Sequence, residues 1–213
     1  GAPRLEGRLR IEDAALYDRN LALALTSIDG AVMLAGDTLR VERLSGRSGG
    51  GSVSVTGSIG LLAEGLPVDL RLIARDAEPV QLDRLQVRGD ADLSLRGQRP
   101  AAMALAGGIQ LHRVDIGLPD RLPPTIVTLD VRERGATRSP RPAASAGAAG
   151  PVAIDLDLAV TAPRAVHVRG RGIDAELGGS LRARGPAQRP EIDGGFTLLR
   201  GEYELLGQRF RFT

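Results

Sequence analysis

The sequence predicts an all-β fold, and three observations support this prediction. Apolar and polar residues alternate along most of the chain, which places the apolar side chains of each strand on one face. Glycine-rich turn signals separate these runs at short intervals, as in an antiparallel meander. Helical periodicity is confined to Ile11–Tyr17 and Val80–Val87, which are too short to cover a sheet. A sheet with one apolar face and no helical layer has to fold on itself, as a barrel, a sandwich or a trough.

The turn signals predict a dozen or more short strands. A strand of about six residues is roughly 20 Å long at ~3.3 Å per residue, comparable with one leaflet of a hydrocarbon core roughly 30 Å thick. A folded sheet of such strands is long enough to enclose an acyl chain. The expected turns are Asp29-Gly30, Gly36-Asp37, Gly49–Gly51, Glu64-Gly65, Gly97–Pro100, Gly178-Gly179, Gly194-Gly195 and Arg200-Gly201.

The composition favours a long, smooth apolar surface over a compact core of closely interlocking side chains. Hydrophobic residues make up 42% of the 213 residues, but aromatic residues only 2%, and there is no Trp. All 28 basic residues are Arg, so a formal net charge of +2 is enough to raise the isoelectric point to about 9.8. The acidic residues are interspersed with the Arg, which argues against a nucleic-acid partner. The absence of Cys excludes disulfides and thiolate chemistry.

One stretch, residues 134–150, differs from the rest because it is rich in Ala, Gly, Ser and Pro. We interpret it as a flexible loop or linker between a first β segment, residues 1–133, and a second, residues 151–213, that continues the same sheet. The uncharged runs are shorter than the roughly 20 apolar residues that span a bilayer. The last residues still alternate, which suggests a section of a longer β protein whose membrane anchor lies elsewhere.

No constellation in the sequence supports catalysis, a metal or a cofactor. His112 and His167 are far apart, and each is expected on the polar side of a strand. Two carboxylate pairs have the spacing that a solvated strand face also produces, namely Asp90/Asp92 and Asp155/Asp157. Two glycine-rich segments lack the Lys, the Ser or the following helix of phosphate-binding and nucleophile motifs, namely Gly49–Gly51 and Gly170–Gly172. We therefore expect a protein that is not an enzyme.

The apolar face is then the remaining functional surface. It is either an ordinary sandwich core or a groove for an apolar ligand, and the scarcity of rings and the lack of charge at the apolar positions favour the groove. The residues expected to line it are Leu21, Leu23, Leu25, Val53, Val55, Val68, Leu70, Leu72, Leu93, Leu95, Ile109, Leu111, Ile154, Leu156, Leu158, Val160, Val166, Val168, Phe196, Leu198, Tyr203, Leu205, Phe210 and Phe212.

The last third of the chain closely resembles the TamB family, whose members are the inner-membrane subunits of the translocation and assembly module. The resemblance is most specific at Ala162–Leu181 (APRAVHVRGRGIDAELGGSL) and continues through Pro190–Phe196, Arg200–Tyr203 and Gln208–Thr213. It is looser upstream, at Leu39–Gly51, Pro67–Leu72 and Leu118–Pro124.

The resemblance implies a fold and a role. Members of the family are half-open β-sheet troughs, taco-like in section, with an apolar interior. They cross the periplasm of Gram-negative bacteria from an inner-membrane anchor to an outer-membrane Omp85-type barrel. They are implicated in outer-membrane protein assembly and in phospholipid movement. For this chain the resemblance thus implies a long curled antiparallel or mixed sheet in the periplasm, with docking onto the barrel left to other parts of the parent protein.

Three roles remain open on these grounds. The first is a conduit that shields or conducts apolar cargo, above all phospholipid acyl chains, between the two membranes. The second is a chaperone-like holder of nascent outer-membrane β-barrel strands or autotransporters, which open sheet edges would pair with. The third is a purely structural β-solenoid spacer.

Overall fold

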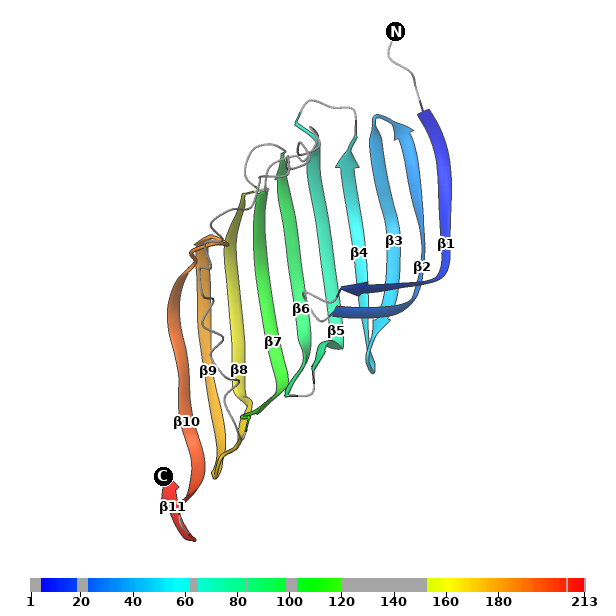
Figure 1. Cartoon of the computed structure of the whole chain (residues 1–213). Helices are drawn as coiled ribbons and strands as arrows, with labels where there is room; N and C mark the ends of the chain where they lie inside the picture. Colours follow the sequence, from blue (N-terminus) through cyan, green and yellow to red (C-terminus); the bar gives the residue numbers. More distant parts are fainter. Residues whose placement is uncertain are drawn as a thin grey trace, which may run out of the picture.

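The computed structural model describes residues 5–18, 23–61, 65–82, 84–98, 103–119, 153–205 and 207–212, and in them eleven strands form one open sheet in sequence order (Figure 1). The strands are β1 (Leu5–Asp18), β2 (Leu23–Gly36), β3 (Thr38–Ser48), β4 (Gly51–Gly60), β5 (Pro67–Leu82), β6 (Leu85–Gln98), β7 (Met103–Gly117), β8 (Ile154–Gly170), β9 (Ile173–Pro186), β10 (Glu191–Leu205) and β11 (Gln208–Phe212). The all-β curled sheet predicted from the sequence is confirmed. No helix that could span a membrane is found in the described part of the chain.

Among the eleven described strands, neighbours pair antiparallel, with one exception. Strands β7 and β8 run parallel, with Met103 opposite Ile154 and Gly117 opposite Arg169. A parallel pair needs a crossover connection of about a dozen or more residues, and the chain between Gly117 and Ile154 is long enough to supply it. The expected linker, residues 134–150, lies outside the described residues, so the division of the chain there remains a prediction.

The strands are much longer than the six residues expected, because many glycines lie inside strands rather than in turns. Strands β1 to β10 contain between 10 and 17 residues. The turns expected at Gly36-Asp37 and Gly49–Gly51 do occur, the first at Asp37 and the second at Gly49 and Gly50. Four other expected turns are wrong and lie within β2, β9 and β10, namely Asp29-Gly30, Gly178-Gly179, Gly194-Gly195 and Arg200-Gly201.

Close backbone approach explains one of these misassigned glycines. A Cβ atom at Gly178 would lie 1.9 Å from the carbonyl oxygen of Pro163, where β8 bulges against β9. Glycine is required here because the neighbouring backbone occupies the space of a side chain, and not because the chain turns.

The two stretches with helical spacing are also strands. Ile11–Tyr17 lies in β1, where the register shifts between Ile11 and Ala14. The bulge adds a residue, so apolar positions there are three apart instead of two. Val80–Val87 contains the end of β5, a turn and the start of β6, and the hairpin produces the irregular spacing.

The sheet bends sharply near one end of β1, β2 and β5. Asp13, Ser27 and Asp76 all have positive φ angles, of 46°, 47° and 49°, which non-glycine residues rarely adopt. Two of these corners share one device. The backbone N–H of Asp13 donates to Asp29 Oδ1 at 3.0 Å, and that of Asp76 donates to Asp90 Oδ1 at 2.7 Å. A carboxylate on the next strand thus accepts the hydrogen bond that the bent strand would otherwise lose.

The bends create two small cores within the described part of the chain. Strand β2 folds over far enough for Leu23 to pair with Val80 of β5 (Figure 1). Beneath this fold lie the buried residues Val53, Ala74 and Ala77, with Leu25 packed against them. A second cluster forms at the β8 bulge, from Val114, Ala162, Ala165 and Val166. The small residues permit the close approach of strands at each bend.

Gly107 allows a direct test of the backbone constraints within a strand. It has a φ of 146°, and a Cβ atom there would lie 2.1 Å from the carbonyl oxygen of Asp92. We expect Gly107→Ala to lower the free energy of unfolding by about 1–3 kcal/mol, measured by denaturant unfolding. The matched control is Gly108→Ala, since nothing lies within 4 Å of a Cβ atom at this position. Equal effects of the two substitutions would contradict the constraint at Gly107.

The Asp76 corner predicts a loss of stability in acid. The Arg88 guanidinium, aided by His112, lowers the pKa of Asp76 from 3.8 to about 2. Because the folded-state pKa is depressed, this carboxylate contributes stability that is fully present above pH 4 and is lost as the pH falls towards 2. The difference in unfolding free energy between the wild type and Arg88→Gln should therefore shrink over that interval. Arg189→Gln removes an Arg that has no ion pair in the described structure and should show no such trend.

Candidate functional site

The candidate site is the apolar face, and the strand register builds it as a series of parallel rows. Residues at partner positions of neighbouring strands project to the same face of a sheet. One such row crosses eight strands through Val32, Val41, Gly57, Leu70, Leu95, Leu105, Leu156 and Gly185. A second row lies on the same face, two rows away from the first. It crosses through Val53, Ala74, Ala91, Ile109, Val160, Leu181 and Gly194. The rows run across the strands, so the apolar surface is continuous from strand to strand.

The bulges do not break this continuity. Where β8 shifts register between Ala162 and Val166, both residues remain paired with β9 positions on the apolar face, Gly179 and Leu177. The unpaired residues of a bulge then lie on the polar face or in the bend itself, outside the apolar rows. The sheet can therefore curve without exposing polar side chains in its apolar rows.

The register places the expected lining residues on this one face wherever they are described. Leu21 lies outside the described residues, and Leu23 is placed only by its backbone pairing with Val80. The remaining residues from Leu25 to Phe212 are distributed over β2, β4 to β8, β10 and β11. Two are buried, Val53 and Val166, whereas Leu198, Leu205, Phe210 and Phe212 are each 47% exposed. Most of the others are half-buried, so the apolar face is only partly covered.

Other residues of the apolar face were missed from the sequence. They include Val32, Leu34, Leu39, Val41, Leu44, Ile59, Met103, Leu105, Leu177 and Leu181. Two physical causes hid them. Glycines such as Gly107 replace apolar residues in some rows and interrupt the alternation. Bulges change the phase, so that Val41 and Leu44 share a face although they are three residues apart.

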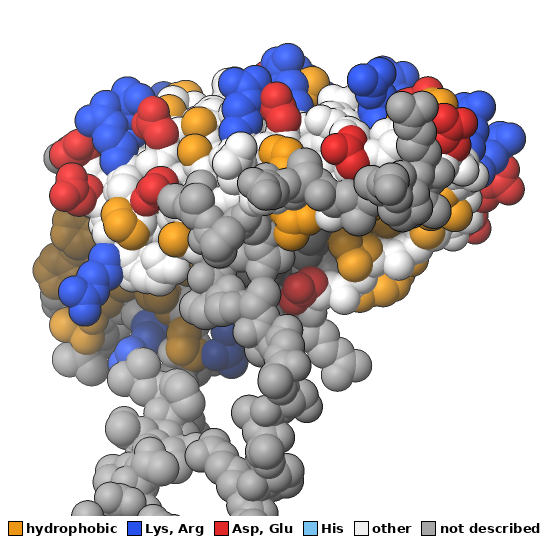
Figure 2. Space-filling model, turned by 90° about the horizontal axis from the view of Figure 1, so that it is seen from above, with side chains coloured by type: hydrophobic (Ala, Val, Ile, Leu, Met, Phe, Trp, Pro, Cys, Tyr) orange, Lys and Arg blue, Asp and Glu red, His pale blue; other side chains and the backbone are white. Residues whose placement is uncertain are grey.

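The opposite face is polar and carries rows of cross-strand ion pairs. Arg71 lies 2.7 Å from Asp92, Arg96 lies 3.1 Å from Asp69, and Arg182 lies 2.8 Å from Asp157. The Arg71 guanidinium holds the pKa of Asp92 below its ordinary value. Most of the charged side chains in view lie along the upper edge of Figure 2, and hydrophobic side chains gather below them. The two faces of the sheet therefore differ in polarity.

One acidic residue on the polar face is buried. The Glu176 side chain is only 8% exposed and lies between the guanidinium groups of Arg164 and Arg200. Arg200, followed by Arg164, lowers the pKa of Glu176. Since the three residues come from β8, β9 and β10, the cluster ties these strands together beside the β8 bulge.

The histidines and paired carboxylates lie on the polar face, as expected. His112 is near two carboxylates, with Nδ1 3.4 Å from Asp76 Oδ1 and Nε2 3.6 Å from Asp90 Oδ2. This contact was not foreseen, because it depends on the bend in β5. In the described part of the chain no group of three or more His, Cys, Asp or Glu residues is arranged to hold a metal ion.

The comparisons with known proteins agree with this architecture. The family model for the TamB C-terminal domain matches residues 42–213, which is well over half of the chain and extends from within β3 to the end. No curated protein and no solved structure matches the chain. The TamB family is a transport and assembly component and not a family of enzymes. A single curled sheet with one continuous apolar face, together with this match, shows that the chain belongs to the TamB family, which has a role in outer-membrane assembly.

Proposed function

We propose that this chain is a periplasmic segment that shields or conducts phospholipid acyl chains between the inner and outer membranes. The observation that carries the proposal is the half-exposed apolar rows, which cross the sheet from β2 to β10. Contiguous apolar surface left open on a folded protein is typical of a binding surface. The required partners are apolar cargo and, at the outer membrane, an Omp85-type barrel.

The chemistry of the rows suits movement better than tight binding. Their residues are chiefly Leu, Val, Ile, Ala and Gly, so the surface is nearly uniform along the path. Each acyl CH₂ group that leaves water on this surface gains about 0.8 kcal/mol. Because the rows resemble one another, an acyl chain that slides from one row to the next loses and gains similar apolar contacts. No single site on the face therefore holds it strongly.

A charge in the centre of the rows should block lipid binding. Leu156 is half-buried on the apolar face, between Leu105 and Gly185. A charged side chain facing hydrocarbon costs about 2.5–3.5 kcal/mol, so Leu156→Arg should reduce lipid extraction from vesicles by about tenfold or more. The measurement is lipid co-purifying with the protein, quantified by mass spectrometry.

The control adds the same charge on the other face. Ala104 is exposed on the polar face, and its partner on β8 is Asp155, which can pair with a new Arg. Ala104→Arg should extract lipid as the wild type does. A wild-type protein that takes up no lipid, or equal extraction by the wild type and Leu156→Arg, would refute the conduit.

A second candidate function rests on the edge of β10. Among the described residues, β11 pairs with Gly201–Leu205, and the backbone of residues 191–200 has a partner on the β9 side alone. Such an edge can accept an extended segment of another protein by strand addition. This arrangement favours a holder of nascent outer-membrane β strands.

Photocrosslinking separates the two functions. A photoreactive residue at Asp193, on the open edge, should capture β-barrel segments if the chain holds nascent strands. The same residue at Ala104, on an internal strand, should not. Adducts with lipid alone, from positions on the apolar face, would favour the conduit. A purely structural spacer would give neither type of adduct.

A further inference from the structure

Strand β7 ends at the lower side of the sheet in Figure 1. The residues around this end line a small hollow that the apolar face does not explain. Gly117 is the last residue of β7, and it lies between two arginines. On one side its backbone N–H donates to the carbonyl oxygen of Arg84 at 2.8 Å, and on the other side its partner on β8 is Arg169. Because Gly117 has no side chain, a hollow of about 270 Å³ opens between them. We call this hollow the Gly117 notch.

The notch has an excess of positive charge. Arg84, Arg113, Arg169 and His167 line it, with Asp115 as the only carboxylate among its lining residues. Arg113 already engages that carboxylate. In the described structure Arg84 and His167 have no ion pair, and Arg169 pairs with Asp174 at 3.6 Å. Asp115 also attracts His167 and Arg169 electrostatically, without a close ion pair to either. The guanidinium groups of Arg84 and Arg169 thus keep N–H donors that can face an external anion.

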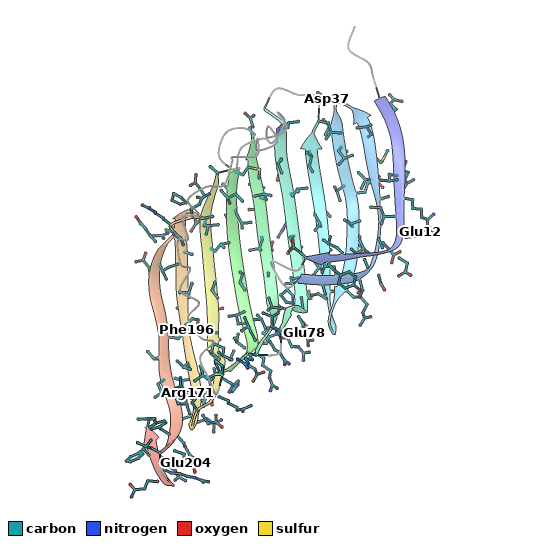
Figure 3. The ribbon with its side chains drawn as sticks, viewed as in Figure 1. Glu12, Asp37, Glu78, Arg171, Phe196 and Glu204 are labelled. Atoms are coloured by element: carbon teal, nitrogen blue, oxygen red, sulfur yellow. The ribbon has the colours of Figure 1, made fainter. Side chains whose placement is uncertain are left out.

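The other face of the sheet at the same level is apolar. Leu85, Ile116 and Val168 form the row of the apolar face that adjoins the notch, one position along each strand. The notch lies at the rim of the sheet, where β6 begins, β7 ends and β8 turns into β9. In Figure 3 this rim runs between the Glu78 and Arg171 labels. An amphiphile that reaches over this rim can place its polar group in the notch and its apolar part on the row.

We infer that the Gly117 notch binds a phosphate group. Guanidinium groups pair with phosphate oxygens through parallel N–H donors, and two of them on either side of a glycine floor form a clamp for a tetrahedral anion. The inference rests on the proposed function in one respect, because a phospholipid headgroup is the source of phosphate that the adjoining apolar row favours.

Three probes distinguish the sources of phosphate. The first is inorganic phosphate, the second is a water-soluble short-chain phosphatidylglycerol, and the third is a neutral alkyl maltoside, which has an apolar tail and no phosphate. Binding to the 213-residue chain is measured by calorimetry and by NMR shifts of the Gly117 amide.

Two variants remove the notch in different ways. Gly117→Val fills it, and a Cβ atom there meets Arg84 at 3.6 Å, an ordinary contact, without a positive φ angle to strain. Arg169→Gln removes one side of the clamp and leaves the backbone unchanged, so it serves if the Val variant folds poorly. Arg189→Gln is the control, because it removes one positive charge from the opposite rim of β9.

The expected result is that both notch variants weaken phosphatidylglycerol binding by about tenfold, while Arg189→Gln and the binding of maltoside do not change. If inorganic phosphate binds as tightly as the lipid, with the same response to the variants, the notch is a phosphate site and the headgroup is not its specific source. Unchanged phosphatidylglycerol binding in both variants overturns the notch and leaves the apolar face intact. A wild-type chain that binds neither amphiphile refutes the proposed function, and phosphate binding then tests the notch alone.

Discussion

The constraint on which the structure depends is that every strand pairing keeps apolar residues on one face, including pairings interrupted by bulges. No helix covers the sheet in the described ranges, so its two faces must differ in polarity for the chain to have a defined inside. The same strand register aligns Arg with Asp on the polar face and apolar residues with one another on the opposite face. A slip of one residue in any strand would exchange them. Glycines and corner carboxylates let the sheet bend while the register holds.

The sequence predicted the fold class and the apolar face because period-two alternation records both directly. It could not predict where the strands end. A glycine in a turn and a glycine under a crossing backbone look alike in sequence, and Gly178 belongs to the second kind. Alternation also fails wherever a bulge adds a residue, so Ile11–Tyr17 resembled a helix, and Leu44 was missed from the apolar face. The polar contacts, such as His112 with Asp76 and Asp90, were invisible because three strands and a bend bring them together.

In the conduit that we propose, the apolar face and the charged rim would divide the tasks that an amphiphilic cargo imposes. The apolar rows would provide binding free energy without strong preference for one position, which permits displacement along the sheet. The arginines at the rim would select a polar group, because charge-assisted hydrogen bonds depend on geometry. The family role in outer-membrane assembly is compatible with either kind of cargo, lipid or nascent strand, and the two use different parts of the molecule: the face for the first, the β10 edge for the second.

The parallel pairing of β7 with β8 also has a consequence for the order in which the described strands pair during folding. Strands β1 to β7 and strands β8 to β11 are each chains of antiparallel neighbours, whose contacts are close in sequence. Contacts of this kind form early, whereas the β7–β8 pairing must first close a long loop. We therefore expect two meanders to form separately and to join along the β7–β8 pairing, which we call the seam. Until they join, β7 and β8 are both unpaired edges, and the Val114–Val166 core between them is open to water. If nascent β strands are the cargo, the joining of this seam is the step at which they would compete most directly with the chain's own strands.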